Sequence, residues 1–297
     1  MTASVLRAAH VPAPMLTPAA TPTTALTPAP TTAPTRPRPA VEAWLYRPVP
    51  RGLQARQLVC FPHAGGDVTA FAALAEESPA GVEVAAVRLP GRGGRFREAM
   101  PSRFDELVAD VAEGIRTRIR PGSVFYGQSF GALLAYEVAR ALPRALRPAL
   151  LVPACAPAPQ DWHGTVPDPA DGALDLFRAC GLADQLPDDS GLRELTLGVL
   201  RADLAVCRSY RHRPAPGFDT PIHAVAGADD PVLAAGRLQA WAQATEGPFA
   251  ATVVPGGHLL ACALDAGPAD LLARLAVGDP LAAGTSPATD LPQGARP

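Results

Sequence analysis

Short apolar segments rich in β-branched residues alternate with helical patterns through the central part of the chain. Six of these segments have the length of strands, at residues 57–61, 82–87, 123–126, 149–154, 222–226 and 250–254. Continuous apolar runs separated by helices are typical of parallel strands that are buried on both faces of a sheet. We therefore predict the α/β class, with a mostly parallel central sheet and helices on both faces.

Two helical regions have distinct places in this pattern. Apolar residues recur at helical spacing from Phe104 to Ile119, between the second and third strands, and Ser102 and Asp105 are placed as an N-terminal capping pair. Residues 168–213 contain helical stretches at 173–180 and 192–210 but no strand pattern. We interpret this segment as a helical lid insertion above the carboxyl edge of the sheet.

The two ends of the chain differ in composition from its centre. Residues 1–40 hold nine prolines among Ala and Thr, which predicts a disordered tail, with a docking arm as the alternative. Residues 279–297 are also rich in Pro, Gly and Ala, and we expect a disordered C-terminal tail. The folded domain is thus predicted at residues 41–278.

Composition and charge exclude several classes of protein. The net charge of −2 predicts no basic surface for nucleic acid, and no apolar run is long enough to cross a membrane. Prolines interrupt the first 20 residues, where a secretory signal would be apolar. The five scattered cysteines include no C-x-x-C pair, which fits neither a disulfide framework nor a zinc site. We expect a cytoplasmic protein with reduced thiols and with no metal or cofactor.

The most informative motif is Gly127-Gln128-Ser129-Phe130-Gly131, which follows the third predicted strand and precedes an apolar helical run. A G-x-S-x-G turn between a strand and a helix is the nucleophile elbow of α/β-hydrolases, where a strained turn lifts the serine hydroxyl above the sheet. The glycines let the strand and the helix approach each other closely. The motif therefore predicts the α/β-hydrolase fold, with Ser129 as its nucleophile.

A serine nucleophile needs a base and a third group that orients the base. His258 lies in a glycine-rich loop after the last predicted strand, and Asp230 lies in the loop after the preceding strand. The order Ser129, Asp230, His258 is the order of an α/β-hydrolase triad, and each residue falls at the carboxyl end of a strand. Asp229 is an alternative acid at the neighbouring position.

The negative charge of a tetrahedral intermediate requires two hydrogen-bond donors. The backbone N–H of Phe130 follows the nucleophile at a helix N-terminus, and the loop after the first predicted strand offers the N–H of Ala64. His63 precedes the elbow in the chain, so we assign it a structural role rather than that of the base. Three further histidines have no motif around them and are interpreted as ordinary residues: His163, His212 and His223.

At these residues the chain resembles the type II thioesterases, the discrete α/β-hydrolases that accompany polyketide synthases and nonribosomal peptide synthetases. The resemblance covers about residues 44–260 and depends on the segments 58–66, 88–92, 127–131, 200–211 and 255–258. In that family the acid lies 28 residues before the catalytic histidine, and 258 − 230 = 28 selects Asp230. The resemblance implies hydrolysis of acyl thioesters on the phosphopantetheine arm of acyl or peptidyl carrier proteins, which clears stalled or wrongly primed groups.

Two positions qualify this resemblance. The family usually has histidine where this chain has Gln128, a difference that concerns the positioning of the elbow or of the pocket wall. Asp203 matches a recurrent family residue, and we interpret it as structural because the Asp230 loop suits the triad acid better. Two further functions stay open: an esterase or amidase of the same fold, and a non-catalytic module that binds carrier proteins.

Substrate preference must come from groups outside the triad, because the same three residues would cleave thioesters and some oxoesters alike. Apolar residues of the predicted lid either line an acyl pocket or simply pack: Leu174, Leu176, Phe177, Leu195 and Leu197. Three arginines near the expected entrance either meet an acidic carrier or a phosphate or serve only solubility: Arg92, Arg95 and Arg97.

Overall fold

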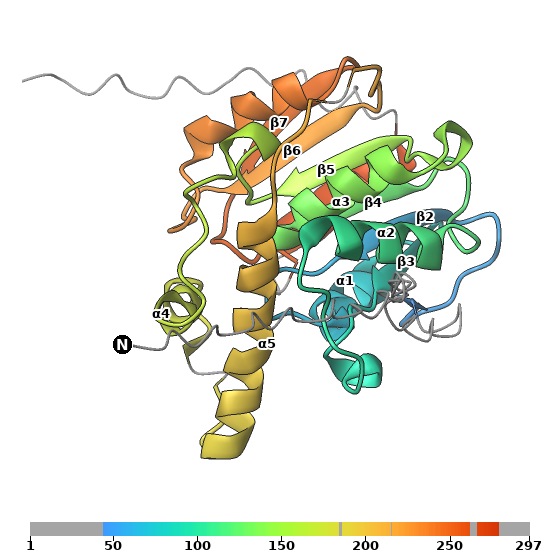
Figure 1. Cartoon of the computed structure of the whole chain (residues 1–297). Helices are drawn as coiled ribbons and strands as arrows, with labels where there is room; N and C mark the ends of the chain where they lie inside the picture. Colours follow the sequence, from blue (N-terminus) through green and yellow to red (C-terminus); the bar gives the residue numbers. More distant parts are fainter. Residues whose placement is uncertain (1–43, 184–185, 215, 262–265, 279–297) are drawn as a thin grey trace, which may run out of the picture. The chain divides into compact units, whose positions relative to one another are not determined.

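The computed structural model describes residues 44–183, 186–214, 216–261 and 266–278, and the tails predicted at 1–40 and 279–297 lie outside these ranges. The described residues form a seven-stranded sheet with the strand order β1-β3-β2-β4-β5-β6-β7 (Figure 1). Its strands are β1 (Leu45–Tyr46), β2 (Arg56–Phe61), β3 (Val82–Val87), β4 (Val124–Gln128), β5 (Leu150–Ala154), β6 (Ile222–Gly227) and β7 (Phe249–Val254).

Helices connect the strands, so the predicted α/β class with helices around a sheet is confirmed. The α-helices are α1 (Ala72–Glu77), α2 (Phe104–Ile115), α3 (Phe130–Ala141), α4 (Gly172–Ala179), α5 (Ser190–Ser209) and α6 (Ala266–Val277). Short 3-10 helices include η3 (Gly93–Arg95), η5 (Pro159–Asp161) and η7 (Ala235–Ala244). Among the described residues, no helix combines the length and the apolar character needed to span a bilayer.

All six predicted strands are present, and they pair in parallel from β3 to β7. The sequence pattern missed only the two-residue β1, which pairs antiparallel with β3 at one edge. The chain adds strands in one direction from β2 to β3 and in the other direction from β4 to β7. The direction therefore reverses between β2 and β4, and the carboxyl ends of the strands at such a switch point border a crevice that binds ligands.

The sheet is buried on both faces because alternate side chains of each strand enter different clusters. Val59, Phe61 and Phe125 pack on the face that α2 and α3 cover. Leu58, Cys60 and Tyr126 point to the opposite face, where they pack with residues of α1 and α6. This arrangement explains why the strands have continuous apolar runs rather than an alternation of apolar and polar residues.

The predicted cap of α2 is wrong. The N-cap residue is Arg103, one position after Ser102, and no side chain of the cap binds the helix. Asp105 instead pairs with the Arg103 guanidinium at 2.6 Å. The Phe104 N–H donates to Ser209 Oγ at the end of α5, over a distance of 2.8 Å. A residue 105 positions away in the chain thus satisfies the helix start, which a local capping pattern cannot reveal.

Between β5 and β6 the described residues contain α4 and α5 and no strand, as the sequence pattern predicted. Asp189 caps α5, since its carboxylate accepts the Leu192 N–H at 2.8 Å. Apolar residues of both helices pack in a small cluster that also contacts the loop after β2: Ala64, Ala173, Phe177, Leu200 and Leu204. The two helices therefore lie next to the loop that follows β2 rather than against the sheet alone.

Candidate active site

Ser129 occupies a strained turn between β4 and α3. Its φ of 54° and ψ of −121° are rare for a residue with a side chain. A Cβ on Gly127 would lie 2.2 Å from the carbonyl oxygen of Gly131, and a Cβ on Gly131 would lie 2.2 Å from that of Phe61. Both glycines are required because the strand and helix backbones touch here, which confirms the reason given for the G-x-S-x-G pattern.

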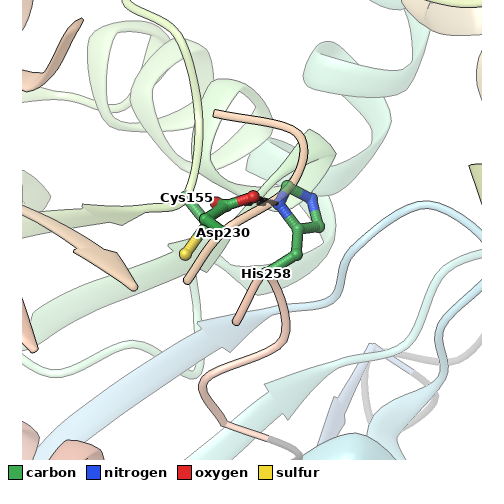
Figure 2. Close-up of side chains that lie close together, drawn as sticks. All are labelled: Cys155, Asp230 and His258. Carbon is green, nitrogen blue, oxygen red and sulfur yellow. Dashed lines mark hydrogen bonds and ion pairs between the residues drawn. The ribbon is translucent and has the colours of Figure 1, made fainter. Parts of the chain in front are cut away.

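His258 is held by the acid that the sequence favoured. Its Nδ1 lies 2.9 Å from Asp230 Oδ1 and 3.0 Å from Oδ2 (Figure 2). The side chains of His258 and Asp230 are only 3% and 0% exposed. Asp229 is exposed, and its backbone N–H donates to the Gly256 carbonyl at 2.9 Å. The structure therefore places Asp230, and not Asp229, against the imidazole.

The Asp230 carboxylate is kept charged by its surroundings. Burial raises the pKa of Asp230, but hydrogen bonding and the charge of His258 outweigh this effect, so that its pKa lies below the ordinary value. The N–H groups of Val232 and Leu233 donate to Oδ1 at 2.8 and 3.0 Å and add to the lowering. A buried carboxylate of this kind can orient an imidazole and stabilise its protonated form.

Ser129 and His258 border the same two small cavities. One cavity of about 80 Å³ is lined by both residues together with Ala64, Phe130, Cys155, Trp162, Val166, Leu176, Leu204, Leu233 and Arg237, among others. A second cavity of about 20 Å³ is bordered by the same pair with Ala64, Leu176, Phe177, Leu182 and Leu200, among others. The structure thus brings Ser129, His258, Phe130 and Ala64 to one cavity, with Asp230 held against His258.

The five apolar residues of the predicted lid differ in what they face. Leu176 borders both cavities and Phe177 borders the second, so these two residues lie where the acyl-pocket alternative requires them. Leu174 and Leu197 line neither cavity, and Leu195 is 68% exposed on the helix surface. The helical pattern identified the apolar residues, but it could not tell which of them face the cavity and which face the core or solvent.

The expectation of entrance arginines is wrong for Arg92 and Arg95, which are 6% and 4% exposed. Arg95 pairs with Glu98 at 2.7 Å and stacks on the Trp44 ring, with its guanidinium carbon 3.7 Å from the ring centroid. Arg97 is exposed, as expected. Sequence reasoning did not select Arg237, an exposed cation that borders the larger cavity, because no motif surrounds it.

Asp203 has the structural role that the sequence analysis assigned to it. Its carboxylate is fully buried in α5 and pairs with the Arg92 guanidinium through two hydrogen bonds, one of them 2.6 Å long. The same carboxylate accepts the Gly65 N–H at 2.8 Å, and Arg92 donates to the Gly66 carbonyl at 3.0 Å. A buried ion pair therefore joins α5 to the loop that contains Ala64.

The other histidines differ in their surroundings. Burial is the main cause that lowers the pKa of His63 to about 4, with further lowering by the charges of His258 and Arg92. His63 is therefore neutral near pH 7 and borders the smaller cavity beside His258. His212 contacts the Tyr210 hydroxyl at 3.3 Å and His223 contacts Thr252 Oγ1 at 2.8 Å, so both have ordinary polar contacts.

Sequence reasoning did not select Cys155, which follows β5 with a positive φ of 50°. Its sulfur, an Asp230 oxygen and a His258 nitrogen lie within 4.8 Å of one another (Figure 2). Burial, followed by the Asp230 charge, raises the pKa of the Cys155 thiol well above its usual range. Zinc accepts this combination of ligand types, but it would require the thiolate and would compete with Asp230 for His258 Nδ1. No sequence motif surrounds Cys155, so its place beside Asp230 and His258 became visible only in the structure, where its positive φ is unusual.

The site combines a serine in a strained turn, an imidazole with a buried carboxylate and backbone N–H groups at a helix N-terminus. This arrangement suits acyl transfer through a serine nucleophile. Residues 56–274 match the family model described as the thioesterase domain. The chain belongs to the thioesterase family. It is a hydrolase of thioesters with the α/β-hydrolase fold, and the resemblance stated from the sequence is confirmed.

Similar thioesterases and related proteins cover most of this chain. Thioesterase PikA5 of Streptomyces venezuelae is 32% identical over 225 residues, which are 72% of this chain and 79% of that protein. The gramicidin S biosynthesis protein GrsT of Aneurinibacillus migulanus is 32% identical and covers 68% of this chain and 81% of its own length. The solved structure of RedJ, a thioesterase from the prodiginine pathway of Streptomyces coelicolor, has 35% identity and a TM-score of 0.67, covering 84% of this chain and 91% of its own.

Proposed function

We propose that this thioesterase hydrolyses acyl thioesters on the phosphopantetheine arm of acyl or peptidyl carrier proteins in polyketide or nonribosomal peptide biosynthesis. There it removes stalled or wrongly primed acyl groups. The observation that carries the proposal is the buried His258–Asp230 pair beside a cavity that Ser129 also lines. The similarity to GrsT, a gramicidin S biosynthesis protein, and to RedJ, from the prodiginine pathway, supports the pathway class.

Ser129 begins the reaction as the nucleophile. Its Oγ attacks the thioester carbonyl carbon while His258 Nε2 takes the hydroxyl proton. Asp230 holds Nδ1–H and stabilises the imidazolium. The oxyanion accepts hydrogen bonds from the backbone N–H groups of Phe130 and Ala64, the first of which lies at the N-terminus of α3.

Collapse of the tetrahedral intermediate breaks the C–S bond and leaves the acyl group on Ser129. The phosphopantetheine sulfur leaves readily as a thiolate because the pKa of such a thiol in solution is about 8.5. It then takes the proton that His258 holds. Water then attacks the acyl-enzyme with His258 again acting as base, which releases the acid and restores Ser129. Each step uses water, residues that border one cavity, and Asp230, which holds His258 from behind that cavity.

Helices α4 and α5 act as the lid in this proposal. Leu176 of α4 and Leu204 of α5 border the larger cavity, so both helices cover the place where an acyl chain must lie. Their apolar side chains exclude water from the thioester and favour an acyl group. We place the enzyme in the cytoplasm, because reducing conditions there keep thiols such as those of Cys60, Cys155, Cys180 and Cys207 free.

The first test compares Ser129→Ala with Ser123→Ala on a carrier protein loaded with an acyl group. Ser123 is 1% exposed and its Oγ has no hydrogen-bond partner in the part of the chain that the structure describes, so its loss should leave activity unchanged. Ser129→Ala should abolish acid release and labelling by a fluorophosphonate. Release at the parent rate by Ser129→Ala would end the proposal.

The second test separates the substrate classes. Turnover of a carrier-bound acyl thioester is compared with that of a matched pantetheinyl thioester and an oxoester with the same acyl group. The proposal expects the carrier-bound thioester to have the highest kcat/KM. Faster turnover of the oxoester would favour a general esterase, and labelling of Ser129 without any thioester hydrolysis would contradict the proposed substrate.

A further inference from the structure

The loop that carries His258 has to cross most of one half of the sheet. It leaves β7 after Val254, whereas Ser129 follows β4, and β5 and β6 lie between these two strands. Neighbouring strands are about 4.8 Å apart, so the three strand spacings amount to about 14 Å. The position of His258 relative to Ser129 therefore depends on what holds this loop along its path.

The loop is bound at the end of each strand that it crosses. At β6, the N–H groups of Ala228 and Asp229 donate to the carbonyl oxygens of Val254 and Gly256 at 2.8 and 2.9 Å. At β5, the Cys155 thiol donates a hydrogen bond to the Gly257 carbonyl oxygen, with a distance of 3.8 Å between sulfur and oxygen. These contacts fix the loop as far as the residue before His258.

The last contact, at the end of β4, comes from Gln128. Its Nε2 donates to the carbonyl oxygen of His258 at 2.7 Å, and its Oε1 accepts the Ala261 N–H at 3.2 Å. The Tyr126 hydroxyl donates to the same Oε1 at 3.0 Å and holds the amide in place. Gln128 is fully buried, so its amide has no competing water.

We propose that Gln128 is a positioning residue that sets the place of His258 relative to Ser129. The inference rests on the proposed roles of these two residues. Gln128 is covalently joined to Ser129, and its side chain binds the backbone of His258 itself, so one residue links the nucleophile to the base. A displacement of about 1 Å between reacting groups can lower the rate about 10²-fold, so the loss of this link should reduce kcat.

The chain offers a matched control in Gln57. This residue is 2% exposed at the start of β2, which is the opposite end of the strands from the site. Its Nε2 donates to the Arg118 carbonyl at 3.2 Å and its Oε1 accepts the Arg120 N–H at 3.0 Å. Both glutamines thus join a strand to a neighbouring backbone segment, but only Gln128 does so beside the proposed base.

The experiment measures kcat, KM, the rate of Ser129 labelling by a fluorophosphonate and the Tm for Q128L and Q57L in the full chain. Q128L should lose about 10²-fold in kcat and in labelling rate, with KM nearly unchanged. Q57L should lower the Tm by about as much as Q128L does. At temperatures below its Tm, Q57L should have the same kcat as the parent. Equal losses of kcat in both variants, or a parent kcat in Q128L, would overturn the inference.

A second variant, Q128E, gives a readout that general destabilisation would not change. Its carboxylate keeps an acceptor for Ala261 but sets an oxygen against the His258 carbonyl. A buried carboxyl group has a raised pKa, and its protonated form again donates a hydrogen bond. The ratio of kcat/KM between Q128E and the parent should therefore rise as the pH falls, whereas a ratio that is flat with pH contradicts the inference.

The outcomes separate this inference from the proposed function. If the proposed function is wrong, the parent itself fails to release acid from the carrier thioester or to label at Ser129. If only the inference is wrong, the parent reacts and labels, and Q128L does so at the same rate.

Discussion

The buried pair of Arg92 and Asp203 should be highly sensitive to the loss of either charge. The substitution Asp203→Asn keeps the shape of the side chain and an acceptor for the Gly65 N–H, but it removes the charge. The two side chains are 5% and 0% exposed, so the Arg92 guanidinium would remain in the interior without a counter-charge. Breaking a buried pair from one side in this way costs about 3–5 kcal/mol of the free energy of unfolding.

This loss is large against a total stability of about 5–15 kcal/mol for a folded domain. For a domain of this size each kcal/mol shifts the Tm by about 2–4 °C, which predicts a fall of roughly 6–20 °C for Asp203→Asn. Thermal and urea unfolding, followed by circular dichroism, measure both quantities. The pair also holds Gly65 and Gly66, so its loss should loosen the loop that contains Ala64. We therefore expect a lower kcat even at temperatures below the Tm, where the variant is folded.

The control is Glu113→Gln, the same change of a carboxylate to an amide in an exposed pair. Glu113 lies 2.7 Å from Arg116, and the two side chains are 44% and 49% exposed, so the substitution should cost at most about 1 kcal/mol. The double variant Arg92→Met with Asp203→Leu should recover part of the loss, because it leaves no unpaired charge in the interior. If Asp203→Asn were no more destabilising than Glu113→Gln, the buried pair would not have the importance argued from its geometry.

Three further predictions concern the site and its frame. Asp230→Asn should lower kcat about 10⁴-fold while the fold is retained, because it removes the carboxylate that holds His258 Nδ1–H. Single-turnover kinetics measure this loss, and a loss of less than tenfold would contradict the prediction. Gly131→Ala should prevent soluble folding because its Cβ would lie 2.2 Å from the Phe61 carbonyl oxygen, whereas Gly198→Ala in α5 meets nothing within 4 Å and should stabilise by about 1 kcal/mol in urea unfolding. The folded pKa of His63 is about 4 against an ordinary 6.5, so the unfolded chain binds the proton more readily, and up to about 3 kcal/mol of stability should be lost as the pH falls from 6.5 through 4. His63→Gln should reduce this loss in urea titrations at several pH values, and an unchanged loss would refute the assignment.

The sequence alone determined most of the fold and the chemical type of the site. All six predicted strands are present because parallel strands buried on both faces require continuous apolar runs, and that requirement is visible within each segment. The glycines around Ser129 also predicted the turn correctly, because the close approach of β4 and α3 leaves no room for a Cβ. Ser129, Asp230 and His258 could be selected because each follows a recognisable strand, and their order along the chain is that of an α/β-hydrolase triad.

Only the tertiary structure decided which side chains face one another across long separations. Asp230 and Asp229 are adjacent in the chain; the family spacing favoured Asp230, and the turn of their loop is the physical reason that Asp230 meets His258. Arg92 was expected at the surface, but it meets an aspartate 111 residues away. Gln128 meets the His258 backbone across 130 residues, and no local pattern marks that contact. Local patterns report how each segment buries its own apolar face, whereas the partners of a buried charge or amide depend on how distant segments converge once the sheet has formed.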